Sequence, residues 1–257
     1  LHICIYYDLW DAPHGKRSDH PHDVALKAAL QRFDAATLGE ARAIYTNSKI
    51  VSKRLETFNG LKSQPLYPPI FRPERFRCDG YGDEILAVCR VEPHKRQALL
   101  VEAMAHVKTP VRLRLCGKSG HSAYGEALQA RIVDLQLSDR IAFENRWISE
   151  EEKADLLAGA LAVAYLPHDE DSYGYPSLEA AHALKPVITA TDSGGVLELV
   201  EDDRNGLIVE PEPKAIAAAF DRLWREKATA ARLGAGNLQR LSEMAINWDH
   251  VVETLTA

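Results

Sequence analysis

The sequence has 257 residues, of which 46% are hydrophobic and 26% charged, and its formal net charge at pH 7 is −6. This composition is that of a globular protein and excludes a nucleic-acid binder, which would carry a basic excess. No apolar run approaches the roughly 18 residues that a membrane-spanning helix needs. Four scattered cysteines without a C-x-x-C pair indicate reduced thiols, so a cytoplasmic protein is expected.

The first 77 residues differ from the rest of the chain in charge. They hold 12 Lys/Arg and 8 Asp/Glu, whereas the remainder holds 19 and 29. One interpretation is peripheral contact of this basic segment with an anionic lipid or acceptor, which would place the protein at the inner membrane face. The alternative, which we favour, is an uneven spread of solvated charges.

The segment before residue 76 predicts helices followed by a linker. A strand-like start at Leu1–Tyr7, without Met or a signal-peptide pattern, predicts a fragment whose upstream part is absent. Helical patterns follow at Val24–Phe33 and Ser48–Phe58. The prolines of Tyr67–Pro73 force an extended backbone, which predicts an interdomain linker. A polar loop, rather than a metal site, is predicted for three histidines whose spacing fits no standard ligand pattern: His14, His20 and His22.

From about residue 84 onward, short apolar runs alternate with helical patterns. Alternation of this kind predicts an α/β fold, a Rossmann-like parallel sheet flanked by helices, in which ligands bind beyond the carboxyl ends of the strands. Ser149 and Glu152 have the spacing of a capping box at a helix start, and Trp248–Ala257 predicts a closing helix. The predicted strands are Ile85–Cys89, Val111–Cys116, Arg140–Glu144, Leu161–Leu166, Pro186–Thr191 and Leu207–Glu210.

The most informative stretch follows the fourth predicted strand, where an acidic loop leads into a helix near Gly174. Unpaired N–H groups and the helix dipole favour an anion at such a helix start, and glycine lets a phosphate approach the backbone. Asp171 and Glu179 bracket this position. We interpret them as acceptors for sugar hydroxyls; an equal alternative is that Asp171 caps the helix and Glu179 lies on a solvated face.

Basic residues follow the first of these strands. Arg90 and Lys95 are placed to neutralise a diphosphate at the same edge of the sheet, each charged hydrogen bond contributing roughly 1.5–3 kcal/mol. Solvation at a helix start is the alternative, and we prefer it for Arg96.

Two glycine turns complete the pattern. Gly117-Lys118-Ser119 is not a P-loop, because Arg112 stands where that motif requires glycine, and it predicts a tight turn at the floor of the pocket. Gly194 and Gly195 join a strand to a helix, for which a plain turn is the simple explanation. No G-x-G-x-x-G follows any strand, which argues against a dinucleotide oxidoreductase.

Taken together, these motifs resemble those of the retaining GT-B glycosyltransferases of family 4 type (glycosyl transferases group 1). The Glu-x7-Glu motif of that family corresponds to Asp171–Ala180, and its G-R-x4-K phosphate motif to Cys89–Lys95. The Gly-Gly turn and Asn205–Val209 match in order and spacing, and Asn47–Lys49 and Tyr67–Pro69 resemble the end of the family's acceptor domain and its interdomain linker.

The resemblance implies an N-terminally incomplete chain in three parts. Residues 1–75 would be the remainder of an N-terminal acceptor domain with its linker, 76–240 the nucleotide-sugar-binding Rossmann-like domain, and 241–257 the C-terminal closing helix.

It also implies roles for individual residues. Arg90 and Lys95 would hold the donor diphosphate, helped by backbone amides near Gly174 and Tyr175. Glu179 would bind the nucleotide ribose, and Asp171 the hydroxyls of the transferred sugar. The nucleotide base would lie near Arg146 and Trp147, and His2 would face the donor sugar. Tyr173 and Gly117 would also belong to the residues that bind the substrate.

The implied reaction transfers a hexosyl group from a GDP-, UDP- or ADP-linked sugar to a sugar, polysaccharide or lipid-linked acceptor, with retention and without a metal or other cofactor. Two residues depart from the family pattern. Asp171 replaces Glu and is one methylene shorter, so the sugar contact is altered or passes to Glu170, and Cys89 replaces Gly. The alternative function is an incomplete sugar-nucleotide-binding module without transferase activity of its own.

Overall fold

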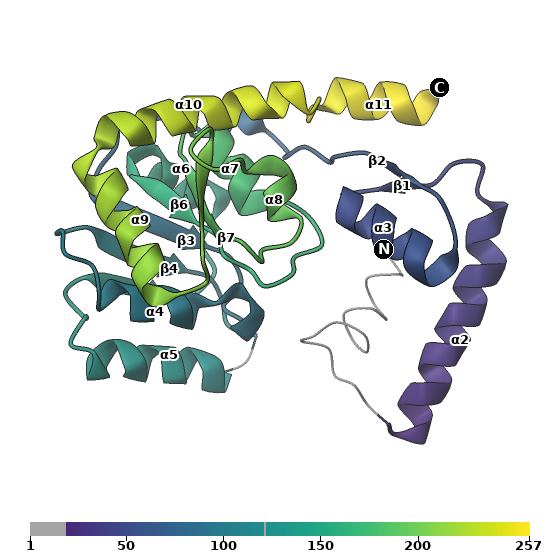
Figure 1. The fold of residues 1–257 in the computed structure, drawn as a ribbon, viewed down its shortest axis with the longest axis horizontal. Coiled ribbons are helices and arrows are strands. Elements are labelled where there is room, and N and C mark those ends of the chain that lie inside the picture. Colours follow the sequence, from purple (N-terminus) through teal and green to yellow (C-terminus); the bar gives the residue numbers. More distant parts are fainter. Residues whose placement is uncertain (1–18, 121) are drawn as a thin grey trace. The chain divides into compact units, whose positions relative to one another are not determined.

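A computed structural model describes residues 19–120 and 122–257 (Figure 1). The chain divides into two compact units, Leu1–Pro68 and Pro69–Ala257. The predicted strand at Leu1–Tyr7 and the histidines His2 and His14 lie outside the described residues.

The first unit is mainly helical, as predicted. Leu55 is buried at its centre among partly buried leucine and isoleucine side chains. Ser48 caps the second helix, where its Oγ accepts a hydrogen bond of 3.0 Å from Val51 N, and Gly60 ends that helix with φ of 67°. The elements are α2 (Pro21–Thr37), η2 (Leu38–Glu40), β1 (Tyr45–Thr46), α3 (Lys49–Asn59) and β2 (Gln64–Pro65), the two short strands being parallel.

The second unit is built on a six-stranded sheet. All neighbouring strands of this sheet are parallel, in the order β5-β4-β3-β6-β7-β8. This confirms the predicted fold class and the six predicted strands, whose observed ends differ from the predicted ones by at most two residues. The strands are β3 (Glu84–Val88), β4 (Arg112–Cys116), β5 (Ile141–Glu144), β6 (Ala162–Ala164), β7 (Val187–Ala190) and β8 (Gly206–Val209).

Helices connect the strands and cover both faces of the sheet (Figure 1). Short 3-10 turns lie at η3 (Pro73–Arg75) and η4 (Pro93–Lys95). The helices are α4 (Gln97–Met104), α5 (Ser122–Asp134), α6 (Glu150–Gly159), α7 (Tyr175–His182), α8 (Val196–Leu199), α9 (Pro213–Arg225), α10 (Lys227–Glu243) and α11 (Trp248–Thr256). The predicted closing helix is thus α11, and Trp248 Nε1 donates to Ile70 O over 3.0 Å.

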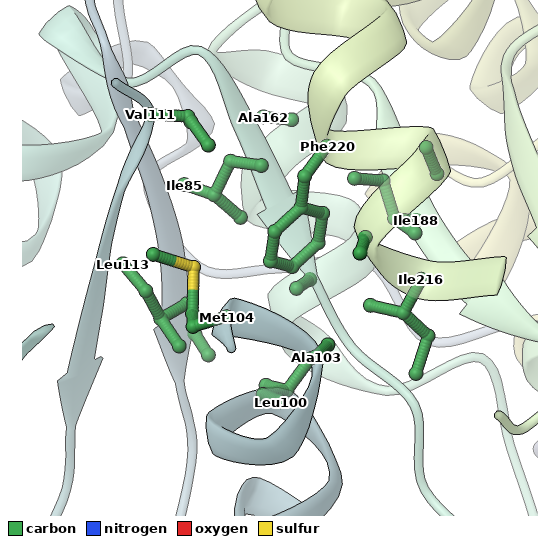
Figure 2. Close-up of a cluster of buried hydrophobic side chains, with 14 of the residues drawn as sticks. Ile85, Leu100, Ala103, Met104, Val111, Leu113, Ala162, Ile188, Ile216 and Phe220 are labelled. Carbon is green, nitrogen blue, oxygen red and sulfur yellow. The ribbon is translucent and has the colours of Figure 1, made fainter. Parts of the chain in front are cut away.

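The main hydrophobic core lies between one face of this sheet and helices α4 and α9. It forms because side chains alternate along each strand, so that Ile85 faces these helices while its neighbour Leu86, also buried, faces the other side. Figure 2 shows this cluster, with Leu100 and Met104 from α4, Ile216 and Phe220 from α9, and Ile85, Leu113 and Ile188 from the strands.

The predicted capping box at α6 forms only in part. Ser149 Oγ accepts from Glu152 N over 3.1 Å, which confirms the helix start. The Glu152 carboxylate does not complete the box but bonds the guanidinium of Arg146. An ion pair to a nearby cation has replaced the return bond to the cap.

The order of strands defines a topological switch between β3 and β6. From β3 the chain builds outward through β4 and β5, then returns to add β6 on the other side of β3 and continues through β7 and β8. At such a switch the loops after two neighbouring strands diverge to opposite faces, and the crevice they leave is where open α/β sheets bind ligands. The loops concerned follow Val88 and Ala164.

Candidate functional site

The loop after β3 presents a buried lysine. The Lys95 side chain is only 8% exposed, and its Nζ donates to the hydroxyl of Tyr165 over 3.0 Å and to the carboxylate of Glu170. The loop is held in shape by Gln97, whose Nε2 donates to Arg90 O over 2.8 Å. Lys95 therefore lies at the switch point, against residues that follow β6.

The loop after β6 supplies both partners of this lysine. Tyr165 follows the last residue of the strand directly, and its hydroxyl donates to Glu170 Oε2 over 3.0 Å. The two loops are also joined through the backbone, because His168 N donates to His94 O over 2.8 Å. The predicted convergence of the two loops is thus present in the structure.

Gly174 opens α7 at the same place. It is the N-cap residue with φ of 70°, so the predicted helix start is confirmed. A Cβ added at Gly174 would lie 2.3 Å from Cε1 and 2.7 Å from the hydroxyl oxygen of Tyr165. Glycine is required here by both the positive φ and the tyrosine ring. The helix start and the Lys95 ammonium therefore lie against one and the same hydroxyl.

The Gly-Gly turn after β7 is a packing surface for the acidic loop. A Cβ on Gly194 would lie 2.3 Å from Glu170 O, and one on Gly195 would lie 2.7 Å from Ser172 Cα. Gly195 N also donates to Glu170 O over 2.8 Å. The plain-turn interpretation is therefore incomplete, because these glycines fix the backbone of the residues that face Lys95.

Arg90 is placed differently from Lys95. Its side chain is 72% exposed, and its guanidinium pairs with Glu92 Oε1 at 2.9 Å. It lies on the solvent side of the loop, so a ligand would have to draw it away from Glu92. Arg96, for which we preferred a solvation role, forms a bidentate pair with Asp192 at 2.6 Å for each bond.

Glu179 lies inside the molecule, so the alternative of a solvated face is wrong. Its side chain is 7% exposed, and Lys153 Nζ donates to it over 2.5 Å. Lys153 also donates to Glu150 over 2.9 Å. Burial raises the pKa of Glu179, and the Lys153 charge opposes this rise without cancelling it.

The remaining residues around the start of α7 differ in exposure. Asp171 is partly buried and follows Glu170 directly in the acidic loop. Tyr173 is 2% exposed, so its ring is buried. Tyr175, the first residue of α7, is exposed. The roles implied for these residues stay predictions.

The other candidates lie at the ends of β4 and β5. Gly117 has φ of 153°, and an added Cβ would lie 1.8 Å from Cys89 O, so this turn is a close contact between neighbouring loops. Arg146 pairs with Glu144 and Glu152, and Trp147 is exposed. Both follow β5, the edge strand two positions from β3. A base-binding role there stays a prediction, as does the role of His2, which lies outside the described residues.

Sequence reasoning missed two residues of this site. Tyr165 was treated as part of the predicted apolar strand Leu161–Leu166. Its position near the carboxyl end of that strand, where ligands bind in a parallel sheet, could have marked it as a candidate site residue. Lys153 lies on α6 and carries no motif, so its pairing with Glu179 depends on tertiary packing alone.

Two classes of feature are not found in the described ranges, 19–120 and 122–257. None of their helices has both the length and the apolar character needed to cross a bilayer. No group of three or more His, Cys, Asp or Glu within those ranges is arranged to hold a metal ion.

The parallel six-stranded sheet flanked by helices matches the fold of GT-B glycosyltransferase structures. The family model described as "Glycosyl transferases group 1" matches residues 76–240. The chain belongs to this family.

Curated relatives are glycosyltransferases of several kinds. The chain is 34% identical over 176 residues to a D-inositol 3-phosphate glycosyltransferase from Frankia alni, covering 65% of this chain and 42% of the relative. It is 26% identical over 244 residues to the human alpha-1,3/1,6-mannosyltransferase ALG2, covering 84% of this chain and 58% of the relative. The chain thus spans about half the length of these relatives.

Solved structures share the fold. Anabaena Alr3699/HepE in complex with UDP has a TM-score of 0.78 at 21% identity, covering 89% of this chain and 67% of that one. The C-terminal domain of a glycosyl transferase group 1 family protein (LpcC) from Francisella tularensis has a TM-score of 0.56 at 21% identity, covering 69% of this chain and 94% of that one.

Proposed function

We propose that this chain binds a nucleoside diphosphate sugar and takes part in the retaining, metal-independent transfer of its hexosyl group to a sugar, polysaccharide or lipid-linked acceptor. The observation that carries the proposal is the meeting of Lys95 with the start of α7 at the hydroxyl of Tyr165. An ammonium group and the amides of a helix start both attract phosphate oxygens, and together they would stabilise the charge that develops on a leaving diphosphate.

Family membership and relatives support this proposal. The relatives are named as a D-inositol 3-phosphate glycosyltransferase and a mannosyltransferase, and the Anabaena structures hold UDP or UDP-glucose. GDP, UDP and ADP all remain candidate leaving groups for this chain. A thermal-shift screen with the three diphosphates and their sugar conjugates would select among them.

Removing the cations tests the phosphate assignment. We expect Lys95→Ala and Arg90→Ala each to weaken binding of the selected diphosphate about tenfold or more, since each removes a charged hydrogen bond. Calorimetric titration measures the affinity, and Lys227→Gln, which removes an exposed lysine paired with Asp83, is the matched control. Unchanged affinity in both site variants would remove the assignment.

Glu179 tests the ribose assignment. We expect Glu179→Gln to weaken binding of a nucleoside diphosphate more than binding of inorganic pyrophosphate, because only the nucleoside offers hydroxyl donors to a carboxylate. Competition titrations with both ligands measure the two losses. Equal losses would show that Glu179 only supports the fold through Lys153.

A second candidate function is a sugar-nucleotide-binding module that has no transferase activity by itself, since the described candidate residues all lie in the single unit Pro69–Ala257. Assays of donor hydrolysis and of transfer separate the two. Transfer that continues in excess EDTA, with an anomeric configuration in the product equal to that of the donor, would support the first candidate. Diphosphate binding without turnover would support the second.

A further inference from the structure

The lysine assigned to the diphosphate already has an anionic partner. Glu170 contacts the Lys95 ammonium directly, and both side chains are largely withdrawn from solvent, at 17% and 8% exposure. Tyr165 joins the pair, since its hydroxyl accepts from Lys95 and donates to Glu170, each over 3.0 Å. An incoming diphosphate therefore meets an ammonium group that a carboxylate has neutralised.

Glu170 is ionised in this arrangement. Burial by itself would raise the pKa of the Glu170 carboxyl, but the Lys95 charge and its hydrogen bond bring the pKa below the ordinary value of a glutamate. A phosphate group placed beside this carboxylate would face an unfavourable like-charge contact in a poorly solvated place. Ligand and carboxylate therefore compete for one cation.

The backbone at Glu170 is fixed in place by contacts with the Gly-Gly turn. The peptide oxygen of Glu170 accepts from Gly195 N over 2.8 Å, and Gly194 packs so closely that a Cβ there would lie 2.3 Å from the same oxygen. Only the side chain of Glu170 is then left to move, by rotation about its own bonds. The hydrogen bond from Lys95 to the Tyr165 hydroxyl does not involve the Glu170 carboxylate, so rotation of that carboxylate does not require it to break.

We propose that Glu170 is an internal counter-ion of Lys95 that holds the lysine in position, and that the donor diphosphate binds by displacing the Glu170 carboxylate from the ammonium. This inference rests on the proposed function. Glu170 is then a positioning residue: it neutralises the Lys95 charge before the diphosphate binds, and it weakens diphosphate binding.

Neutral variants of Glu170 test this inference, because they are expected to bind diphosphate more tightly than the wild type. Glu170→Gln keeps the length and an acceptor oxygen but removes the charge, so it should bind the selected nucleoside diphosphate and inorganic pyrophosphate about fivefold more tightly than the wild type. Glu170→Asp keeps the charge and should stay near the wild-type affinity. Glu170→Ala is a second neutral variant, expected to change affinity in the same direction should the glutamine variant fold poorly.

Glu102→Gln is the matched control. It removes the same charge from a surface pair with Arg131, between α4 and α5, and should leave affinity unchanged. Calorimetric titration of each full-length variant at low ionic strength gives the comparison.

The outcomes are distinct. Tighter binding in the neutral Glu170 variants, but not in Glu170→Asp or Glu102→Gln, supports displacement of a counter-ion. Equal or weaker binding in both neutral variants overturns the inference and leaves the proposed function standing. Failure of every variant and of the wild type to bind any diphosphate overturns the proposed function, and the inference with it.

Discussion

Gly174 illustrates how one missing Cβ shapes the candidate site. Alanine at this position would place its Cβ against the Tyr165 ring and impose a side chain on a positive φ. We expect Gly174→Ala to lower the free energy of unfolding by about 1–3 kcal/mol and to weaken diphosphate binding, because the displaced ring moves the hydroxyl that holds Lys95. Urea unfolding and calorimetric titration measure the two effects.

Gly159→Ala provides the control for that substitution. Gly159 is the last residue of α6, and among the described residues no atom other than those of its chain neighbours and its own helix backbone lies within 4 Å of a Cβ added there. Its replacement should leave binding unchanged and stability unchanged or raised by up to ~1 kcal/mol. Equal losses in both alanine variants would show that the contact with Tyr165 has no special importance.

Part of the candidate site could be predicted from the sequence at the level of single residues. Lys95 and Gly174 could be placed together because parallel strands end at one edge of a sheet, which is a property of the pattern alone. The partners of these residues could not be predicted. The partners of Glu170 and Lys153 are determined by side-chain rotamers and loop packing. The sequence contains several carboxylates and cations at similar spacing, so it does not show which of them pair.

Among the elements, α9 is tied to the turn between α4 and β4 by one carboxylate. Asp221 accepts from Lys108 N at 3.1 Å, Thr109 N at 2.9 Å and Thr109 Oγ1 at 2.7 Å. We expect Asp221→Asn to lower the free energy of unfolding by about 1–3 kcal/mol at pH 7, because an amide offers a weaker acceptor to buried donors. Urea denaturation measures the loss.

The same carboxylate predicts a dependence on pH. Burial alone would raise the pKa of Asp221, but the hydrogen bonds from Thr109 and Lys108 hold the pKa below its usual value. The stability it adds is therefore fully present above the unfolded pKa of about 3.9 and is lost as pH falls through the lower folded value. The difference between wild type and Asp221→Asn should shrink as pH falls below 4. Asp134→Asn, at an exposed position on α5, should change stability little at any of these pH values.

Elements were the most predictable level of this structure. The six strands are buried runs between helical patterns, and burial on both faces leaves a continuous apolar signal that sequence shows directly. The capping box was predicted only in part, since Ser149 acts locally whereas Glu152 was drawn to Arg146 by tertiary contact.

At the scale of the whole molecule, the described candidate residues all lie in Pro69–Ala257. This unit has its own sheet and core. We expect residues 69–257, produced alone, to unfold cooperatively and to bind the selected diphosphate within about threefold of the full chain. Thermal unfolding followed by calorimetric titration measures this, and loss of binding in a folded product would show that residues 1–68 contribute to the site.

The switch between β3 and β6 also has a consequence for folding. Lys95 and Glu170 are 75 positions apart, and the intervening chain forms α4, β4, α5, β5, α6 and β6. Bringing such distant residues together is slow, because the entropy of closing a long loop is lost before the contact rewards it. On a ribosome, where the chain emerges from its N-terminus, the cationic loop is complete well before its acidic partner is synthesised. The contact between Lys95 and Glu170 can thus form only after β6 has been synthesised and added beside β3.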